Sequence, residues 1–149
     1  MDTNKEWVDV YFVNDCGPDV EYIEKNIKRS ISKQNNFYYK RNSNNLGFVK
    51  NCNNSVFNLV TDKKADILLL NSDTIVTEGF LEEMHRILYS RENIGVVNPR
   101  SNNATVWSVP MDGRYSNSPR KSYKQWKQLK QQIPEKYISP TAHGFCMLI

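Results

Sequence analysis

The stretch 63–80, "KKADILLLNSDTIVTEGF", decides which fold this chain is expected to adopt. An apolar run from 67 to 70 leads directly into Asn71, Ser72 and Asp73, and a helix-like pattern follows. A short continuous apolar run bounded by polar residues is typical of a buried strand. The question is therefore why a buried strand ends by presenting a carboxylate.

Strand-like and helix-like segments alternate on both sides of this stretch. β-branched and aromatic runs predict strands at 7–15, 35–41, 65–70 and 93–99. Apolar residues at helical spacing predict a helix after each of the first three strands. Pro18 is expected at the start of the first helix, and Thr77 is expected to cap the third. From about residue 8 to 98 this alternation predicts an α/β fold with a mostly parallel sheet and helices on both faces.

The segment after Pro99 has a different character. Residues 100–120 are polar and predict long loops with one short strand, "ATVWSV", and 122–133 predict a basic amphipathic helix. The Lys and Arg residues of 114–130 are most simply a solvated face, with a phosphate or lipid-headgroup surface as the alternative. "HGFCMLI", at 143–149, predicts a final strand. We therefore expect residues 1–149 to form a single domain, with a core over 8–98 and loops, a helix and a strand over 99–149.

Composition limits the class of protein. The 149 residues are 39% hydrophobic and 24% charged, as in ordinary globular domains, and the net charge of +4 is too small to indicate nucleic-acid binding. Three widely spaced cysteines without a CxxC pair indicate neither a zinc site nor a disulfide framework, and favour a cytoplasmic location. No apolar run approaches the roughly 20 residues that span a bilayer, so any membrane contact is expected to be peripheral. The sequence leaves open whether the chain forms a homo-oligomer.

Polar residues at the predicted strand ends suggest chemistry. In sheets of this kind ligands bind at the carboxyl ends of the strands, where Asp15 and Asp73 are expected. A carboxylate about 4 Å from a phosphate costs roughly 4 kcal/mol at an effective dielectric constant of about 20, and a divalent cation between them reverses the sign. Mg²⁺ is often held by one or two carboxylates together with substrate phosphates. Asp73, supported by Asn71 and Ser72, thus suits a metal–diphosphate site, with capping of a turn or helix as the alternative.

Two further features near the strand ends are weaker on their own. Asp15 can accept a hydrogen bond from the imide of a pyrimidine base, and helix capping is the alternative. In "NNLGFVKNCNN", at 44–54, Gly47 allows close approach of the backbone to a ligand. Asn45 and Asn53 can donate to ribose or phosphate oxygens, although Asn-rich turns are common.

Taken together, these segments resemble family-two glycosyltransferases with the GT-A (Rossmann-like) fold, most closely the rhamnosyltransferase-like branch. "FVNDCGPD", "NNLGFVKNCNNSV", "ADILLLNSDTIVTEGFLEEM", "IGVVNPR" and "HGFCMLI" occur in the family's order, over residues 8–109 and 143–149. The coupling of "NLGF" to "LLLNSDT" at the family's separation is the most specific element. The resemblance implies a nucleotide-diphosphate sugar donor, a saccharide or other hydroxyl acceptor, and Mn²⁺ or Mg²⁺ as cofactor.

The resemblance also implies roles for single residues. Asp15 matches the acidic residue that recognises the base of the donor. Asp73 matches the last position of the DxD motif, which binds the metal, and Asn71 stands at its first position. The nucleotide-sugar pocket then includes the positions Asn45, Gly47, Asn53, Asn71 and Ser72, and Gly144 approaches the acceptor side. Asp15 and Asp73 are expected to line one crevice.

Two departures from the family qualify this expectation. The strand and helix that precede the "DD" strand in the family, and the segment beyond "GFCMLI" that supplies the catalytic base, have no counterpart in this sequence. We therefore expect an incomplete GT-A domain whose catalytic residues are unknown and which lacks transfer activity as an isolated chain.

Two other classes stay open. A receiver-type phosphoacceptor domain also alternates strands and helices, and Asp15 and Asp73 imitate its acidic positions. However, Asn14 and Asp15 replace its acidic pair, and no Lys ends a fifth strand. The third reading is a non-catalytic remnant that binds a sugar nucleotide or a protein partner.

Overall fold

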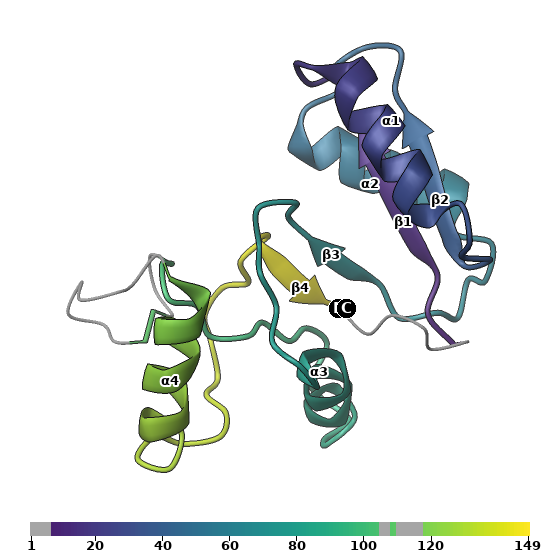
Figure 1. Ribbon diagram of the computed structural model, residues 1–149. Coiled ribbons are helices and arrows are strands. Elements are labelled where there is room, and N and C mark those ends of the chain that lie inside the picture. The colour runs from purple at the N-terminus through teal and green to yellow at the C-terminus, as the bar shows by residue number, and fades with distance from the viewer. Residues whose placement is uncertain (1–6, 105–107, 110–117) are drawn as a thin grey trace. The chain divides into compact units, whose positions relative to one another are not determined.

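The computed structural model describes residues 7–104, 108–109 and 118–149 (Figure 1). The chain divides into two compact units, an N-terminal unit (Asp2–Ala65) and a C-terminal unit (Asp66–Ile149). The described residues form four helices and four strands, which confirms the mixed α/β class. Each unit is described by itself.

The N-terminal unit is built on a parallel pair of strands. β1 (Val10–Asn14) pairs with β2 (Phe37–Arg41), with Val10 opposite Phe37 and Asn14 opposite Arg41. Aromatic side chains support this register, because the rings of Tyr11 and Tyr38 stack with their centroids 4.8 Å apart. Such cross-strand aromatic contacts stabilise a sheet beyond its backbone hydrogen bonds.

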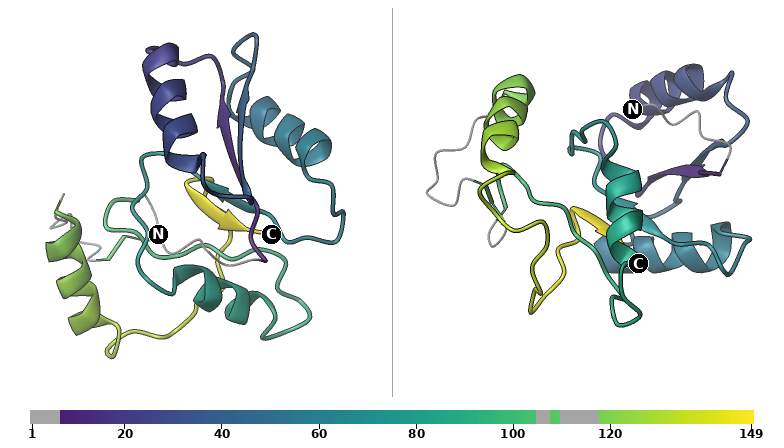
Figure 2. Two further views of the ribbon diagram at one scale, coloured as in Figure 1. Left: turned by 45° about the vertical axis from the view of Figure 1, so that its right-hand side comes forward. Right: turned by 90° about the horizontal axis from the view of Figure 1, so that it is seen from below.

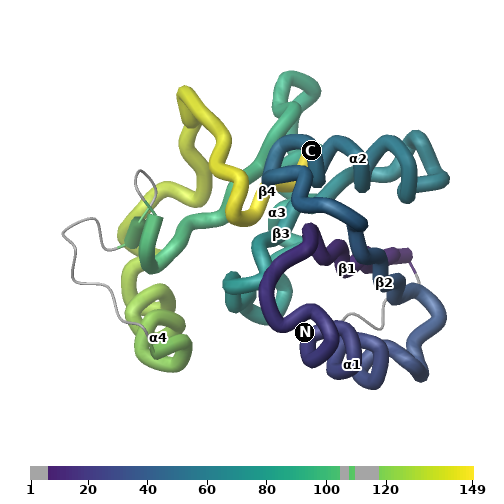
Figure 3. Tube along the Cα trace, turned by 90° about the horizontal axis from the view of Figure 1, so that it is seen from above, coloured from purple at the N-terminus to yellow at the C-terminus, as the bar shows by residue number. Residues whose placement is uncertain are grey.

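Helices cover both faces of this pair. α1 (Val20–Ile31) and α2 (Phe48–Leu59) lie on opposite sides of β1 and β2 (Figures 1 and 3). In both helices the apolar residues recur at intervals of three and four, so each presents an apolar stripe toward the strands. The predicted arrangement of helices on both faces of a parallel sheet is thus present in this unit.

The C-terminal unit combines an antiparallel strand pair with two helices. β3 (Leu68–Leu70) pairs with β4 (Cys146–Leu148), with Leu68 opposite Leu148. α3 (Phe80–Leu88) packs beside the pair, whereas α4 (Pro119–Leu129) stands apart from it (Figure 2). The core consists of apolar side chains from α3, β4 and the segment between the two helices, namely Met84, Leu88, Val97, Cys146 and Leu148.

Several details differ from the sequence-based expectation. Among the strands of the described residues, β1 and β2 pair in parallel whereas β3 and β4 pair antiparallel, and a parallel bridge joins Ser101 and Ser108. The strand predicted at 93–99 is reduced to an isolated bridge between Val97 and Leu148. The physical reason lies in the next residue: the Asn98 amide donates to the carbonyls of His143 and Cys146, so a side chain takes the place of a backbone ladder.

One predicted helix cap was wrong, that of Thr77, whereas Pro18 lies near the start of the first helix as expected. Gly79, in the left-handed conformation at φ 75°, is the N-cap of α3, and Thr77 contributes only its carbonyl to Phe80. Pro18 precedes α1, whose N-cap is Asp19 at φ 53°. In both cases a turn with positive φ sets the direction of the helix, which a capping side chain does not predict.

Predictions for the segment after Pro99 have mixed outcomes. The basic helix is confirmed as α4, and the final strand as β4. The strand predicted for "ATVWSV" lies partly outside the described residues, although Ser108 forms a bridge with Ser101. Arg114 also lies outside them. Within the part of the chain that the structure describes, no helix has the length and apolar character needed to cross a membrane.

Candidate functional site

The carboxyl ends of β1 and β2 bring two polar side chains together. The parallel register that pairs Asn14 with Arg41 places the next residues, Asp15 and Asn42, side by side. The Asn42 amide donates to Oδ1 of Asp15 over 2.7 Å. The meeting of these side chains therefore follows directly from parallel pairing, which aligns strand ends at one edge.

Asp15 also binds the backbone that begins α2. The amides of Leu46 and Gly47 donate to its carboxylate over 2.9 and 2.8 Å. These N–H groups stand at the helix N-terminus, where they lack partners within the helix. Asp15, more than thirty residues earlier in the chain, thus fixes the backbone that leads into α2. The alternative of helix capping is not observed, because neither α1 nor α2 has a side-chain cap.

These contacts favour the ionised form of Asp15. The hydrogen bond from Asn42, followed by those from the backbone of Leu46 and Gly47, holds the pKa of Asp15 below its ordinary value. An ionised carboxylate has about four lone-pair sites, and the three internal N–H donors use most of them. Asp15 therefore fixes the shape of the loop and retains little capacity for a further donor.

Asn42 is a residue that the sequence did not single out. It is only 7% exposed, and its amide nitrogen donates both to Asp15 and to Oδ1 of Asn51, the latter over 2.8 Å. It therefore links the end of β1 to α2. Asn42 directly follows the second predicted strand, just as Asp15 follows the first, and this position could have identified it. The segment 42–54 contains several other Asn residues, so Asn42 did not stand out.

The loop that these contacts hold contains two of the predicted ligand-binding residues. Gly47 has φ 74° and ψ 162°, a backbone conformation open essentially to glycine alone. Asn45 accepts a hydrogen bond from the Gly47 amide over 3.0 Å and is exposed. Asn53 is exposed on α2. The loop from 42 to 47 is thus a fixed polar turn that faces solvent at the N-terminus of a helix, a location that suits anionic groups.

Cys52, which lies near this network, is chemically quiet. Burial, and to a smaller degree the charge of Asp15, raise the pKa of its thiol. A raised pKa keeps the thiol protonated near neutral pH, which removes its nucleophilic form. Cys146 in the other unit is buried and has its pKa raised to about 11 by desolvation. Neither cysteine is suited to covalent chemistry.

The end of β3 has a different organisation. The Asn71 amide donates to the carbonyl of Phe145 over 2.8 Å, and the Thr74 amide donates to the Asn71 carbonyl over 3.1 Å. These bonds form a tight turn of which Ser72 and Asp73 are the exposed residues. Within the described ranges, the Asp73 carboxylate forms no hydrogen bond or ion pair. The turn thus holds its shape through its backbone and leaves the carboxylate unused.

A divalent cation fits Asp73 only with further ligands. In the parts of the chain that the structure describes, no three His, Cys, Asp or Glu side chains lie together as a metal site. Mg²⁺, however, is commonly held by one or two carboxylates, with phosphate and water oxygens completing the octahedron. An exposed and unpaired carboxylate is compatible with that role. Asp73, with the Asn71 and Ser72 side chains beside it, therefore fits a cation that arrives with a phosphate ligand.

The segment before β4 is tied to this turn. The Phe145 carbonyl also lies 3.5 Å from the Thr74 hydroxyl, and the His143 amide donates to Oδ1 of Asn98 over 3.1 Å. Gly144 lies between these anchored residues. The C-terminal unit thus places Gly144 close in the chain to the residue that holds the Asp73 turn.

The predicted site residues fall into two groups. Asp15, Asn45, Gly47 and Asn53 belong to the N-terminal unit, whereas the turn from Asn71 to Asp73 belongs to the C-terminal unit. The expectation that Asp15 and Asp73 line one crevice stays a prediction.

Comparison of the chain with protein-family models, curated proteins and solved structures found no match.

Proposed function

We propose that this chain is a glycosyltransferase-type domain of the GT-A kind that binds a nucleotide-diphosphate sugar with the help of a divalent cation. The observation that carries the proposal is the exposed carboxylate of Asp73, which follows a largely apolar strand and forms no hydrogen bond or ion pair with the residues that the structure describes. An unused carboxylate in a tight turn is available to a ligand.

In this proposal the metal is bound cooperatively with the donor. A single carboxylate holds Mg²⁺ or Mn²⁺ weakly, because the cation needs about six ligands and prefers to keep its water. The diphosphate of the donor supplies further oxygens, and the cation cancels its repulsion from Asp73. Asp73 would hold such a cation, which would supply Lewis-acid stabilisation of a departing nucleoside diphosphate during an inverting transfer to an acceptor hydroxyl.

The loop from 42 to 47 belongs to the N-terminal unit and is considered by itself. The exposed Asn45 side chain is the group of this loop that would meet a nucleoside, because the amides of Leu46 and Gly47 already donate to Asp15. Asp15 acts as a positioning residue, because its oxygens already serve Asn42 and the amides of Leu46 and Gly47. Its effect on donor binding is therefore transmitted through the loop, and base recognition by direct contact is secondary.

Calorimetric titration of the 149-residue chain with UDP, dTDP and GDP, each with and without Mn²⁺, tests the proposal. We expect one nucleotide to bind in the presence of Mn²⁺ and to lose at least about 10-fold in affinity without it, as expected for loss of a charge-bridging cation. Mn²⁺ alone is expected to bind weakly. Nucleotide affinity that is indifferent to Mn²⁺, or no binding at all, would refute the proposal.

A matched pair of variants separates the site from general charge. Asp73→Asn removes the proposed metal ligand, whereas Glu78→Gln removes another exposed carboxylate from the same connection between β3 and α3. Both variants lower the negative charge by one unit. We expect only Asp73→Asn to abolish the Mn²⁺ dependence, and equal effects of the two would indicate nonspecific cation binding.

The receiver-type phosphoacceptor is disfavoured by one observation. Doubly wound domains of that type have parallel strands, whereas β3, which ends three residues before Asp73, pairs antiparallel with β4. Incubation with a small phosphodonor and Mg²⁺ followed by intact-mass measurement is the direct test. We expect no added phosphate, and the mass of one phosphate on Asp73 would favour the receiver.

A further inference from the structure

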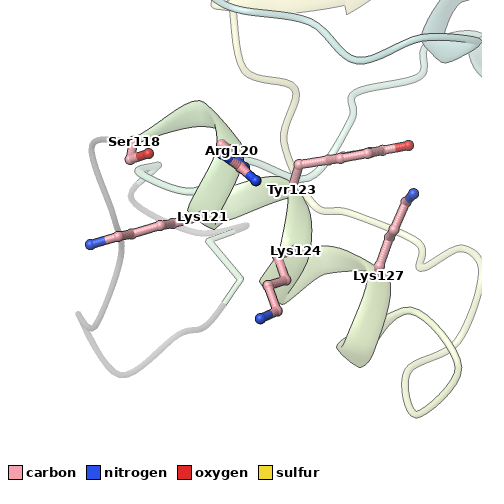
Figure 4. A pocket seen from close by; sticks show the side chains of 6 residues that line it. All are labelled: Ser118, Arg120, Lys121, Tyr123, Lys124 and Lys127. Carbon is pink, nitrogen blue, oxygen red and sulfur yellow. The ribbon is translucent and has the colours of Figure 1, made fainter.

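α4 carries a cationic surface that belongs to neither of the sites described above. We define the basic face of α4 as its four exposed cationic side chains, those of Arg120, Lys121, Lys124 and Lys127. Together with Ser118 and Tyr123 they border an open hollow of about 560 Å³ (Figure 4). The face covers more than two turns of an eleven-residue helix.

The spacing of these residues puts their charges on one side of the helix. At about 100° per residue, the four positions fall within roughly 120° of the helix circumference. Residues 113–134 include no Asp or Glu, so the helix contributes no compensating charge. Among the described residues, none of the four cations forms an ion pair with a carboxylate. The basic face therefore presents uncompensated positive charge to its surroundings.

The opposite side of α4 is already in use. The Arg100 guanidinium lies 5.6 Å from the centre of the Trp126 ring and 5.0 Å from that of Tyr137, and it also donates to the Pro134 carbonyl. Leu129 is half-buried on the same side of the helix. These contacts hold the apolar side of α4 against its own unit and keep the basic face outward.

We propose that the basic face docks this protein on the surface of an anionic lipid bilayer. Clusters of four or more Lys and Arg residues on one helix face are attracted by the negative surface potential of such membranes. Because Trp126 and Leu129 pack within the protein, the helix does not insert its apolar side. Docking is therefore electrostatic and reversible, and it does not depend on sugar transfer.

The arrangement of the side chains favours a lipid surface over a single small anion. Figure 4 shows Lys121, Lys124 and Lys127 extending in different directions instead of converging on one point. Divergent cations meet many headgroup phosphates at once but do not enclose one. The charge distribution thus matches an extended anionic plane.

A lipid surface also fits better than nucleic acid. Proteins that bind single strands combine cations with open aromatic faces on which bases stack. The only aromatic ring at the hollow is that of Tyr123 among the residues described, and the Lys127 ammonium lies over it, 4.6 Å from its centre. The basic face therefore offers charge without a free stacking platform.

Vesicle flotation with the full chain tests the proposal. We expect the protein to float with vesicles that contain phosphatidylglycerol and to stay behind with vesicles of phosphatidylcholine alone. Raising the salt from about 0.1 M to about 1 M shortens the Debye length from about 10 Å to about 3 Å and should release the protein. Equal binding to neutral vesicles, or binding that salt does not weaken, would overturn the proposal.

Two variants with equal net charge locate the binding surface. One changes the basic face by Arg120→Gln, Lys121→Gln, Lys124→Gln and Lys127→Gln. The control changes four exposed lysines of the N-terminal unit, by Lys25→Gln, Lys33→Gln, Lys50→Gln and Lys64→Gln. Gln has nearly the same helix propensity as Lys, so α4 is expected to persist, and far-ultraviolet circular dichroism checks this.

The basic-face variant should lose on the order of 100-fold in partitioning to anionic vesicles, because each cation near the surface contributes separately. The control variant should lose much less. Equal losses in both variants would refute the assigned surface. Binding of an RNA duplex that needs the basic face, without any binding to anionic vesicles, would assign the face to nucleic acid and overturn the proposal.

Discussion

The two strand ends that carry Asp15 and Asp73 use the same kind of residue in opposite ways. Asp15 accepts hydrogen bonds from Asn42, Leu46 and Gly47 and fixes a loop. Asp73 is exposed on a turn that its neighbours hold through the backbone, and it has no partner among the described residues. In sequence the two look alike, since each is a carboxylate at the end of an apolar strand.

The difference shows which end depends on its side chains for its shape. Removing one partner from a buried polar network leaves the remaining groups without hydrogen bonds, and their desolvation lowers the free energy of unfolding. Removing an exposed side chain without partners costs the fold almost nothing. Substitutions after β1, around Asp15, should therefore change the free energy of unfolding. Substitutions after β1 and after β3 should both change the affinity for the donor. The following predictions test that contrast, from the largest expected effect on stability to the smallest.

Asn42→Ala should have the largest effect. Because Asn42 is 7% exposed and joins Asp15 to Asn51, its loss leaves buried polar groups unpaired, at a cost of about 3 kcal/mol. Urea unfolding followed by circular dichroism measures this change. Asn44→Ala, at an exposed neighbouring position, is the control and should change the free energy of unfolding by less than about 0.5 kcal/mol. Similar values for both would mean that the network does not stabilise the loop.

Gly47→Ala should have the next largest effect. The conformation at φ 74° and ψ 162° is strained for any residue with a Cβ atom, so we expect a loss of about 1–2 kcal/mol. No heavy atom lies within 4 Å of the position of an added Cβ, so the cost comes from the backbone and not from a clash. Gly95→Ala has similarly open space without the positive φ, and it should be close to neutral. A neutral Gly47→Ala would show that the loop is not held as described.

The pH dependence of the Asp15 loop should be small and confined to acid. Because hydrogen bonds from Asn42 and then from Leu46 lower its pKa, Asp15 contributes stability that is fully present above the ordinary value of 3.8. This stability is lost as the pH falls through the lower pKa of the folded state. The amide NMR signals of Leu46 and Gly47 should titrate with a midpoint below 3.8, and this titration should be absent in Asp15→Asn. A midpoint above 3.8 would contradict the hydrogen-bonding assignment.

Asp73→Asn should have the smallest effect on stability. An exposed carboxylate without described partners contributes less than about 0.5 kcal/mol to folding, so the urea midpoint should hardly move. The same variant should abolish Mn²⁺-dependent nucleotide binding. A variant that loses stability and binding together would place Asp73 in the same structural role as Asp15, and the contrast between the two ends would fail.

Much of the local structure was predictable from the sequence. The apolar periodicities of 48–59 and 80–88 predicted α2 and α3, and the runs at 68–70 and 146–148 predicted β3 and β4. α3 and β4 carry strong patterns because Met84, Leu88, Cys146 and Leu148 are buried in the core. The prediction of a strand at 93–99 was wrong. The side-chain amide of Asn98 donates to the carbonyls of His143 and Cys146, so these carbonyls are already bound by a side chain.

The roles of the polar residues were harder to predict. A sequence shows that Asp15 follows a strand but not which N–H groups will reach it. Those donors lie 27–32 residues further along the chain, and their approach depends on the register of β1 with β2. Asn42 was missed because one Asn among many has no local signature of burial. Hydrogen-bond partners at long sequence separation are set by packing.

The sequence alone determined the class of fold, the segments that become helices and strands, and the placement of polar residues at strand ends, because these follow from the spacing of apolar residues along the chain. Only the tertiary structure decided that Asp15 is occupied by internal donors, that β3 pairs antiparallel and that Arg100 contacts the Trp126 ring of α4. These properties depend on contacts between residues far apart in sequence. The physical reason is that a hydrogen bond or a buried face needs two contacting groups, and the local sequence pattern identifies only one of them.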